Sequence, residues 1–441
     1  MKPHHPQQKN TRRYTWLLLG LLLSYLGASP VIAAEEQTAA PPPTTVEVQL
    51  PEVIVTATVE DPLSGSNSLT EAALETLPDK DGSLNEALAI LPGVQLPDDY
   101  RDSTQGGEIS PPEISISGGR PYDNLITLDG ISVSSQLDPA SNDKLGPNAL
   151  PSASSALTLG KDIIDEITLY RYNIPARYGG FSGGVIDTTT RSPGGQLSAG
   201  LEYRTTQENW SEFFIDEDEQ DDFYASRSAS LQPEFRKHQL DLDLDIPLFS
   251  QTGLLGAYSL SRSEIPLLHF GETTEQTRQI DNFLVKLVQP FNNEDSFTLS
   301  TVYTRYDEDT FRKDTYASDL VYGSEGLVVA GETALFRDNF DFNLLTGFNY
   351  QQNLREAPQS YYSWDVTPSK PWGDDFGTSN SKEGGVRRPV SREYRHRDSP
   401  QCDSPLSNPC HNPRHTIGTS VHLGSSQSGT PRGCLHLFQL L

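Results

Sequence analysis

Several features are scarce in this 441-residue sequence, and each scarcity narrows what the chain can be. Basic residues are few, 33 Lys and Arg against 60 Asp and Glu, and the net charge of −27 argues against a nucleic-acid partner, which needs a basic face. Hydrophobic residues make up 35%, and beyond the first thirty residues no apolar run reaches the length of a membrane-spanning helix. A β-barrel remains compatible with these figures, because only every second residue of its strands faces lipid.

Cysteine is also scarce, and the three cysteines all lie in the last forty residues: Cys402, Cys410 and Cys434. An odd number in one segment does not make a disulfide framework. The nearby His411, His415 and His422 lack the spacing of a zinc site, so we predict neither a metal site nor a cofactor. The sequence has no G-x-S-x-G, H-E-x-x-H or phosphate-cradling loop, and an enzyme is the least supported class.

The first residues have the pattern of a secretory signal. A basic start precedes the apolar stretch Trp16 to Leu26, and small residues ending at Ala33 or Ala34 give a cleavage site. The alternative is an uncleaved anchor helix, for which the apolar stretch is short. We predict a signal peptide over residues 1–34 and an extended Glu/Thr/Pro-rich spacer over 35–50.

A β-prone segment, PEVIVTAT at 51–58, follows the spacer. A strand without a partner in its own domain is free to pair with the sheet edge of another protein through backbone hydrogen bonds. The alternative is that this segment forms the first strand of the globular domain. The candidate contact residues are Glu52, Val53, Ile54, Val55, Thr56, Ala57 and Thr58.

Three motifs mark a compact globule over residues 59–195. Ser83 and Glu86 make a capping box for a short helix in LNEALAILPGVQL, which Pro92 and Gly93 end. The stretch ISISGGRPYDNLITLDGI indicates strands joined by a turn, and DIIDEITLYRYNIPARYGGFSGGVIDTTTRSP follows it. Close-set glycines let backbones approach where a Cβ would collide. The candidate packing residues are Gly118, Gly119, Asp129, Gly130, Gly179, Gly180, Gly183 and Gly184.

From Gln196 the pattern changes to long alternating strands. In HQLDLDLDIPL, leucines alternate with Asp241, Asp243 and Asp245, and three carboxylates on one face need a wet surround such as a barrel lumen. Short turns alternate with long connections, one of them near Glu275, as in outer-membrane barrels. The predicted strands are 197–206, 238–248, 253–265, 279–291, 297–307, 327–336 and 340–351.

These motifs, in this order, resemble the plug domain of TonB-dependent outer-membrane receptors, and the strands resemble the start of their barrel. The resemblance implies an α+β plug domain over 59–195, followed by an antiparallel transmembrane β-barrel over 196–377. It implies the outer membrane of a Gram-negative cell, with the plug and the 51–58 segment, which resembles a TonB box, facing the periplasm. The implied partners are TonB with its inner-membrane motor complex, outer-membrane lipid, and a small-molecule ligand that the sequence does not identify.

The leading hypothesis is active uptake of a scarce nutrient, siderophore-like or another large ligand. A barrel that surrounds a plug needs about twenty-two strands, so the seven predicted strands leave it incomplete. Residues 382–441 shift to eight basic and four acidic residues, and we expect 378–441 to be a disordered or out-of-frame tail. The alternatives are a truncated, non-transporting receptor fragment with a folded plug, and a soluble periplasmic binding module.

The acidic run DEDEQDD, Asp216 to Asp222, lies in the first long connection of the predicted barrel. Its default interpretation is a solvated, self-repelling loop. A calcium loop is the alternative, although the central glycine of an EF-hand is missing.

Overall fold

The computed structural model of the chain describes residues 65–385 and 414–424. Within these ranges the residues not described are 79, 81, 99, 101–102, 136–154, 156, 211, 213–215, 219, 221–228, 230–231, 250, 293–294, 338–339, 357–360 and 376–378. All described residues fall within one compact unit, 54–441. The predicted signal peptide, the spacer and the 51–58 segment lie outside the described residues.

A five-stranded sheet with the order β1-β6-β7-β4-β5 forms the centre of the plug. Its strands are β1 (Ser66–Thr70), β4 (Leu125–Leu128), β5 (Ile131–Ser132), β6 (Ile164–Tyr170) and β7 (Val185–Thr190). The smaller elements around it are α2 (Glu71–Thr76), α3 (Leu84–Leu88), β2 (Val94–Gln95), η2 (Ser103–Gln105), β3 (Ser115–Ile116), η3 (Pro121–Asp123) and η4 (Lys161–Ile163). All of these elements lie within the range predicted for the plug.

Helix α3 begins at the predicted cap. The Ser83 hydroxyl accepts a hydrogen bond from the Glu86 backbone N–H at 3.2 Å, which satisfies one free donor of the first turn. The Glu86 carboxylate accepts from the Lys80 backbone N–H at 2.8 Å, so it ties the helix to the preceding loop. The helix ends at Leu88, one turn earlier than predicted, and Leu84, Leu88 and Leu91 are buried in the core.

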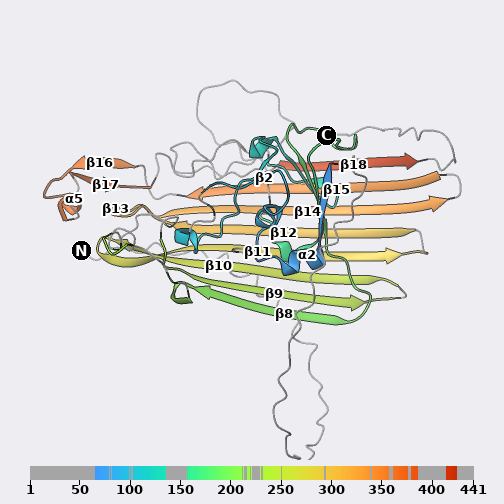
Figure 1. Cartoon of the computed structure of the whole chain (residues 1–441), viewed down its shortest axis with the longest axis horizontal. Coiled ribbons are helices and arrows are strands. Elements are labelled where there is room, and N and C mark those ends of the chain that lie inside the picture. Colours follow the sequence, from blue (N-terminus) through green and yellow to red (C-terminus); the bar gives the residue numbers. More distant parts are fainter. Residues whose placement is uncertain are drawn as a thin grey trace, which may run out of the picture. The chain divides into compact units, whose positions relative to one another are not determined.

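Eight long strands lie side by side in a second sheet, with the order β18-β15-β14-β12-β11-β10-β9-β8 (Figure 1). Seven of them match the seven predicted strands, and every neighbouring pair is antiparallel. Their bounds are β8 (Ser198–Gln207), β9 (Arg236–Pro247), β10 (Gly253–His269), β11 (Glu272–Pro290), β12 (Ser296–Thr310), β14 (Leu320–Arg337), β15 (Phe340–Glu356) and β18 (Arg414–Gly424).

Strand β18 lies in the segment that we expected to be disordered or out of frame. Its backbone pairs with β15 from Gln351↔Arg414 to Asp341↔Gly424. The reason is visible in the sequence, since Ile417, Val421 and Leu423 recur at even spacing in HTIGTSVHL, the period of a strand. Regular pairing therefore extends past residue 377.

The connection near Glu275 differs from its prediction as a long link. Strand β10 ends at His269 and β11 begins at Glu272, with Glu275 already paired to Pro266. Phe270 and Gly271 both have positive φ, 50° and 77°, as a two-residue hairpin turn requires. The threonine-rich sequence ETTEQT continues the strand, so this connection is a tight turn.

The two faces of the long sheet differ as the alternation of β9 predicts. Asp243 and Asp245 point toward the plug, where Arg191 and the backbone N–H of Gly194 lie within 3.8 Å and 3.3 Å of them. Leu201, Leu242 and Val285 point the other way and are exposed. Aliphatic side chains of the plug share one buried cluster with Leu255, Ala257, Leu284, Val302 and Val328 of the long sheet.

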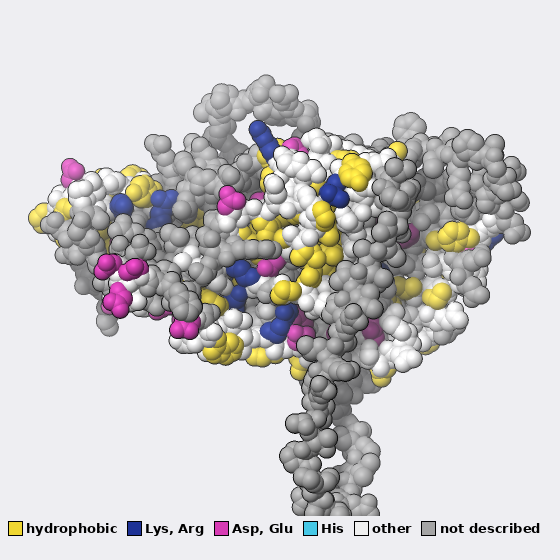
Figure 2. All heavy atoms as spheres, viewed as in Figure 1, with side chains coloured by type: hydrophobic (Ala, Val, Ile, Leu, Met, Phe, Trp, Pro, Cys, Tyr) yellow, Lys and Arg dark blue, Asp and Glu magenta, His cyan; other side chains and the backbone are white. Residues whose placement is uncertain are grey.

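The visible face of the plug carries hydrophobic side chains at its centre, with Lys and Arg side chains beside them (Figure 2). At one end of the long strands a third sheet has the order β13-β17-β16. It comprises β13 (Thr315–Tyr316), β16 (Tyr362–Asp365) and β17 (Asn380–Glu383), and α5 (Trp372–Asp375) packs on β17. Among the described residues no helix has the length and apolarity needed to cross a bilayer.

Candidate functional site

The predicted packing glycines of the plug occupy two kinds of position. At Gly184 a Cβ would lie 2.6 Å from Ile116 Cγ2 and 2.9 Å from the Tyr170 carbonyl, and at Gly183 it would collide with Asn124. Gly119 is also tight, because its Cβ would lie 3.1 Å from the Ile116 carbonyl. Gly118, Gly179 and Gly180 have open space around them, and Gly118 and Gly180 also have positive φ.

Asp129 and Gly130 form the turn between β4 and β5, and both have positive φ. The Asp129 carboxylate accepts hydrogen bonds from the backbone N–H and the hydroxyl of Thr190, at 2.9 Å and 2.8 Å. A Cβ on Gly130 would lie 2.6 Å from Leu345 of β15. This turn therefore fastens the end of β7 and touches the long sheet directly.

Lys286, near the C-terminal end of β11, reaches from the long sheet to this same turn. Its side chain is 5% exposed, and its ammonium donates to the Thr190 carbonyl at 2.8 Å and lies 3.9 Å from the Asp129 carboxylate. A buried ammonium needs such partners, because leaving it unpaired away from water costs several kcal/mol. We call Lys286, Asp129 and Thr190 the lower anchor.

Arg278, eight residues earlier on the same face of β11, makes a second contact with the plug. Its guanidinium is 3% exposed and lies 3.3 Å from Glu108 of the plug and 3.3 Å from Glu308 of β12. The Tyr306 hydroxyl donates to Glu308 at 2.8 Å. We call Arg278, Glu108 and Glu308 the upper anchor.

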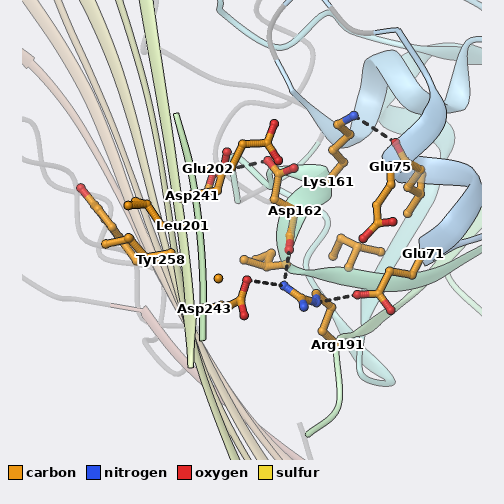
Figure 3. A pocket seen from close by; sticks show the side chains of 17 residues that line it. Glu71, Glu75, Lys161, Asp162, Arg191, Leu201, Glu202, Asp241, Asp243 and Tyr258 are labelled. Carbon is orange, nitrogen blue, oxygen red and sulfur yellow. Dashed lines mark hydrogen bonds and ion pairs between the residues drawn. The ribbon is translucent and has the colours of Figure 1, made fainter. Parts of the chain in front are cut away.

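A cavity of about 280 Å³ lies between the plug and strands β8 to β10 (Figure 3). Arg191 bridges it, with its guanidinium 2.6 Å from Glu71 of α2 and 3.8 Å from Asp243 of β9. Lys161 turns toward α2 and donates to the Leu74 carbonyl at 3.0 Å. Six acidic residues line the cavity: Glu71, Glu75, Asp162, Glu202, Asp241 and Asp243. The polar face of β9 is thus met by charged groups of the plug.

Inside the plug, Asp187 of β7 collects a second set of hydrogen bonds. It accepts from the Thr127 hydroxyl at 2.6 Å and from the Tyr178 hydroxyl at 2.5 Å. Burial raises the pKa of the Tyr178 hydroxyl, and the bond to Asp187 acts in the same direction. Tyr178 therefore stays protonated as a donor, and it fixes the loop that carries Gly179 and Gly180 against the plug sheet.

No metal centre emerges from the described part of the chain, where no group of three or more His, Cys, Asp or Glu side chains is arranged to hold an ion. Cys402, Cys410 and His411 lie outside the described residues, as does much of the run from Asp216 to Asp222. The calcium alternative for that loop stays a prediction. The contact residues predicted at 51–58 also lie outside, and they stay predictions.

Of the residues of the two anchors, the sequence singled out only Asp129, as a candidate packing residue of the plug. Lys286 had a readable signal, because it stands between Val285 and Leu287 in a run, 283–288, that is otherwise apolar. Arg278 and Glu308 had a weaker one, since charged residues are common near the ends of these strands. Glu108 lies 170 positions from Arg278 in a loop, and no local pattern connects the two.

Comparison with known proteins identifies the fold. No protein-family model matches the chain. The uncharacterized protein YddB of Escherichia coli (strain K12) is 32% identical over 218 residues, which are 48% of this chain and 28% of that protein. The crystal structure of the outer membrane transporter YddB from Escherichia coli matches with a TM-score of 0.68 at 22% identity, over 86% of this chain and 47% of that one.

A ferric enterobactin receptor of Pseudomonas aeruginosa, PfeA in complex with enterobactin, matches less well, with a TM-score of 0.47 at 14% identity over 82% of this chain and 46% of that one. The chain spans less than half the length of the YddB protein and structure that it matches. The match to YddB confirms the predicted fold, a plug with part of an outer-membrane barrel that is not closed.

Proposed function

We propose that this chain provides the plug and the adjoining barrel strands of a TonB-dependent outer-membrane receptor that takes up a scarce, large ligand. One observation carries the proposal: the folded plug packs against the polar face of the long sheet, whose other face is apolar. Buried Lys286 and Arg278 face the globule, and Leu242 and Val285 face away from it. A soluble protein has no reason to leave that outer face exposed.

The outer face has the dimensions of a lipid-facing band. Along β11 it runs from Phe283, which packs on Tyr258 with a centroid distance of 4.5 Å, to Phe291 just after the strand. Eight residues of strand cover roughly 27 Å, which at the usual tilt of about 40° spans roughly 20 Å of the apolar band of about 25 Å in outer-membrane barrels. Aromatic side chains at both ends of the band fit the two membrane interfaces.

The connections support an orientation. The connections 248–252, 291–295 and 338–339, all short, lie at one end of the strands. The long connections 208–235 and 311–319 lie at the other end, together with the tight turn at 270–271. In outer-membrane barrels the short turns face the periplasm and the longer loops face outward. The chain enters β8 from the plug at this short-turn end, which the proposal assigns to the periplasm.

The experiment tests the 51–58 segment without knowledge of the ligand. The purified full chain is captured on immobilised periplasmic domain of TonB, as wild type and with Val55→Pro and Thr56→Pro together. Proline removes backbone donors, so a strand-pairing contact should lose at least about tenfold in affinity. The control carries Thr44→Pro and Thr45→Pro in the spacer and should bind as wild type. Equal capture of all three proteins would refute the TonB-box assignment.

A second candidate, a non-transporting product with a folded plug, is favoured by the open order of the long sheet, in which β8 and β18 are edges among the described strands. Digestion by protease in detergent micelles separates the candidates. A receptor that closes its barrel should resist as one heat-modifiable species. A fragment should leave the plug as its main protected product.

A further inference from the structure

The third sheet presents a face lined with aromatic rings. Tyr362 pairs with Glu383 across β16 and β17, and Tyr316 of β13 pairs with Glu383 from the other side. Paired residues point to the same side of a sheet, so these side chains share one face with Trp364, two residues after Tyr362. This small sheet therefore gathers aromatic side chains from two connections that are far apart in the sequence.

The rings continue in a single row. Tyr362 and Trp364 are stacked, with centroids 5.1 Å apart and planes 24° apart. The Lys370 ammonium lies 4.7 Å from the Trp364 ring and 5.2 Å from the Trp372 ring, and so bridges them. Trp372 lies 5.3 Å from Tyr316. We call Tyr362, Trp364, Trp372 and Tyr316 the aromatic row.

Hydrogen bonds hold both indoles in place. Trp364 Nε1 donates to Glu383 at 2.9 Å, and Trp372 Nε1 donates to the Lys382 carbonyl at 2.8 Å. Part of the row is nevertheless exposed: Tyr316 is 56% exposed, Tyr362 47% and Trp364 38%, whereas Trp372 is half-buried. Rigid, exposed rings bind with little loss of conformational entropy, which is why aromatic side chains dominate binding surfaces.

Charge on the row is balanced. Lys370 donates to Glu383, so the cation between the two indoles already has its own carboxylate. In Figure 2, basic, acidic and hydrophobic side chains are interspersed at the end of the molecule that carries β13, β16 and β17. A surface without excess positive charge offers little to an anionic chelate, and the net charge of −27 disfavours nucleic acid.

We propose that the aromatic row binds a neutral, extended oligosaccharide, with sugar rings laid along the successive aromatic rings. The C–H face of a pyranose carries partial positive charge and stacks on the negative face of an aromatic ring. Lys370 and Glu383 lie among the rings of the row, where they supply hydrogen-bonding groups to hydroxyls. A row of rings suits a chain of sugars better than a single compact ligand.

This inference deepens the proposed function. It rests on that function only in assigning the end of the barrel that carries the third sheet to the outside of the cell. The purified full chain in a sugar-free detergent is titrated with cellohexaose, xylohexaose, maltohexaose and chitohexaose, and binding is followed by tryptophan fluorescence and by calorimetry. We expect at least one hexaose to bind saturably. Trp364→Ala should raise its Kd about tenfold or more, which is about 1.4 kcal/mol or more, because the ligand loses an aromatic ring on which it stacks.

The matched control is Trp210→Ala, which removes a 63% exposed tryptophan from the connection between β8 and β9 and should leave Kd unchanged. Tyr362→Phe keeps a ring and should bind as wild type, whereas Tyr362→Ala should not. No binding of any hexaose to wild type, or equal binding by Trp364→Ala, would overturn the proposal. TonB capture is measured separately, so failure here leaves the proposed function standing, and the reverse holds too.

Discussion

The cations of the two anchors lie on one face of β11. They differ in which of their partners belong to the long sheet and which belong to the plug. Arg278 of the upper anchor is paired with Glu108 of the plug and with Glu308 of the neighbouring strand. Both partners shown for Lys286 of the lower anchor, Asp129 and the Thr190 carbonyl, belong to the plug. At the upper anchor, Arg278 therefore has a carboxylate partner within the long sheet itself. At the lower anchor, the partners of Lys286 come from the plug.

This difference gives the interface a direction. The anchors are eight residues apart, roughly 27 Å along the strand. Lys286 lies toward the short-turn end of β11 and Arg278 toward the other end. The proposed function requires a pull on the plug from the short-turn side. Such a pull would first strain the lower anchor, where Lys286 has no partner shown within the long sheet among the described residues. Reseating the plug would restore that contact, so the lower anchor favours a defined resting position.

The largest effect should come from Arg278→Met. It removes the cation and leaves the partly buried Glu108 carboxylate facing the buried Glu308 carboxylate. Leaving such carboxylates without their cation typically costs about 3–5 kcal/mol. Hydrogen exchange of the β7 amides, a readout of plug opening, should accelerate accordingly. Arg305→Met, on the outward face of β12, is the control and should change little. Unchanged exchange in Arg278→Met would mean that the upper anchor does not hold the plug.

Lys286→Met should have the next largest effect. The change leaves the Thr190 carbonyl without its donor and removes the charge beside Asp129, at a cost of about 2–3 kcal/mol. Exchange should accelerate in β7 more than in β12, because the lost contacts belong to the plug. Lys313→Met, in the connection between β12 and β14, is the matched control. Equal acceleration in both strands would show a general loss of the fold and not a release of the plug.

The comparison also shows which features of the structure could be predicted from the sequence. Alternation predicted all seven strands and the inward direction of Asp241, Asp243 and Asp245, because a period of two is a local property. It did not predict that the strand through Glu275 continues to a tight turn, since threonine and glutamate occur in both strands and loops. The partners of Arg278 and Lys286 were out of reach for another reason. They depend on how the plug docks, which no local pattern encodes.

The smallest effect, and the sharpest test of the comparison, comes from neutralising one plug carboxylate at each anchor. Glu108→Gln should cost only about 1 kcal/mol, because Arg278 keeps Glu308 and the anchor loses its excess negative charge. Asp129→Asn should cost more, since Asp129 also accepts two hydrogen bonds from Thr190 and is the only carboxylate shown beside Lys286 among the described residues. Asparagine tolerates the positive φ of this position, so backbone strain does not confuse the result. Exchange rates of the β7 amides in the two variants, measured side by side, decide the matter. If Glu108→Gln accelerates exchange as much as Asp129→Asn does, the pairing of Arg278 with Glu308 does not compensate for the loss of Glu108. The two anchors would then be equivalent.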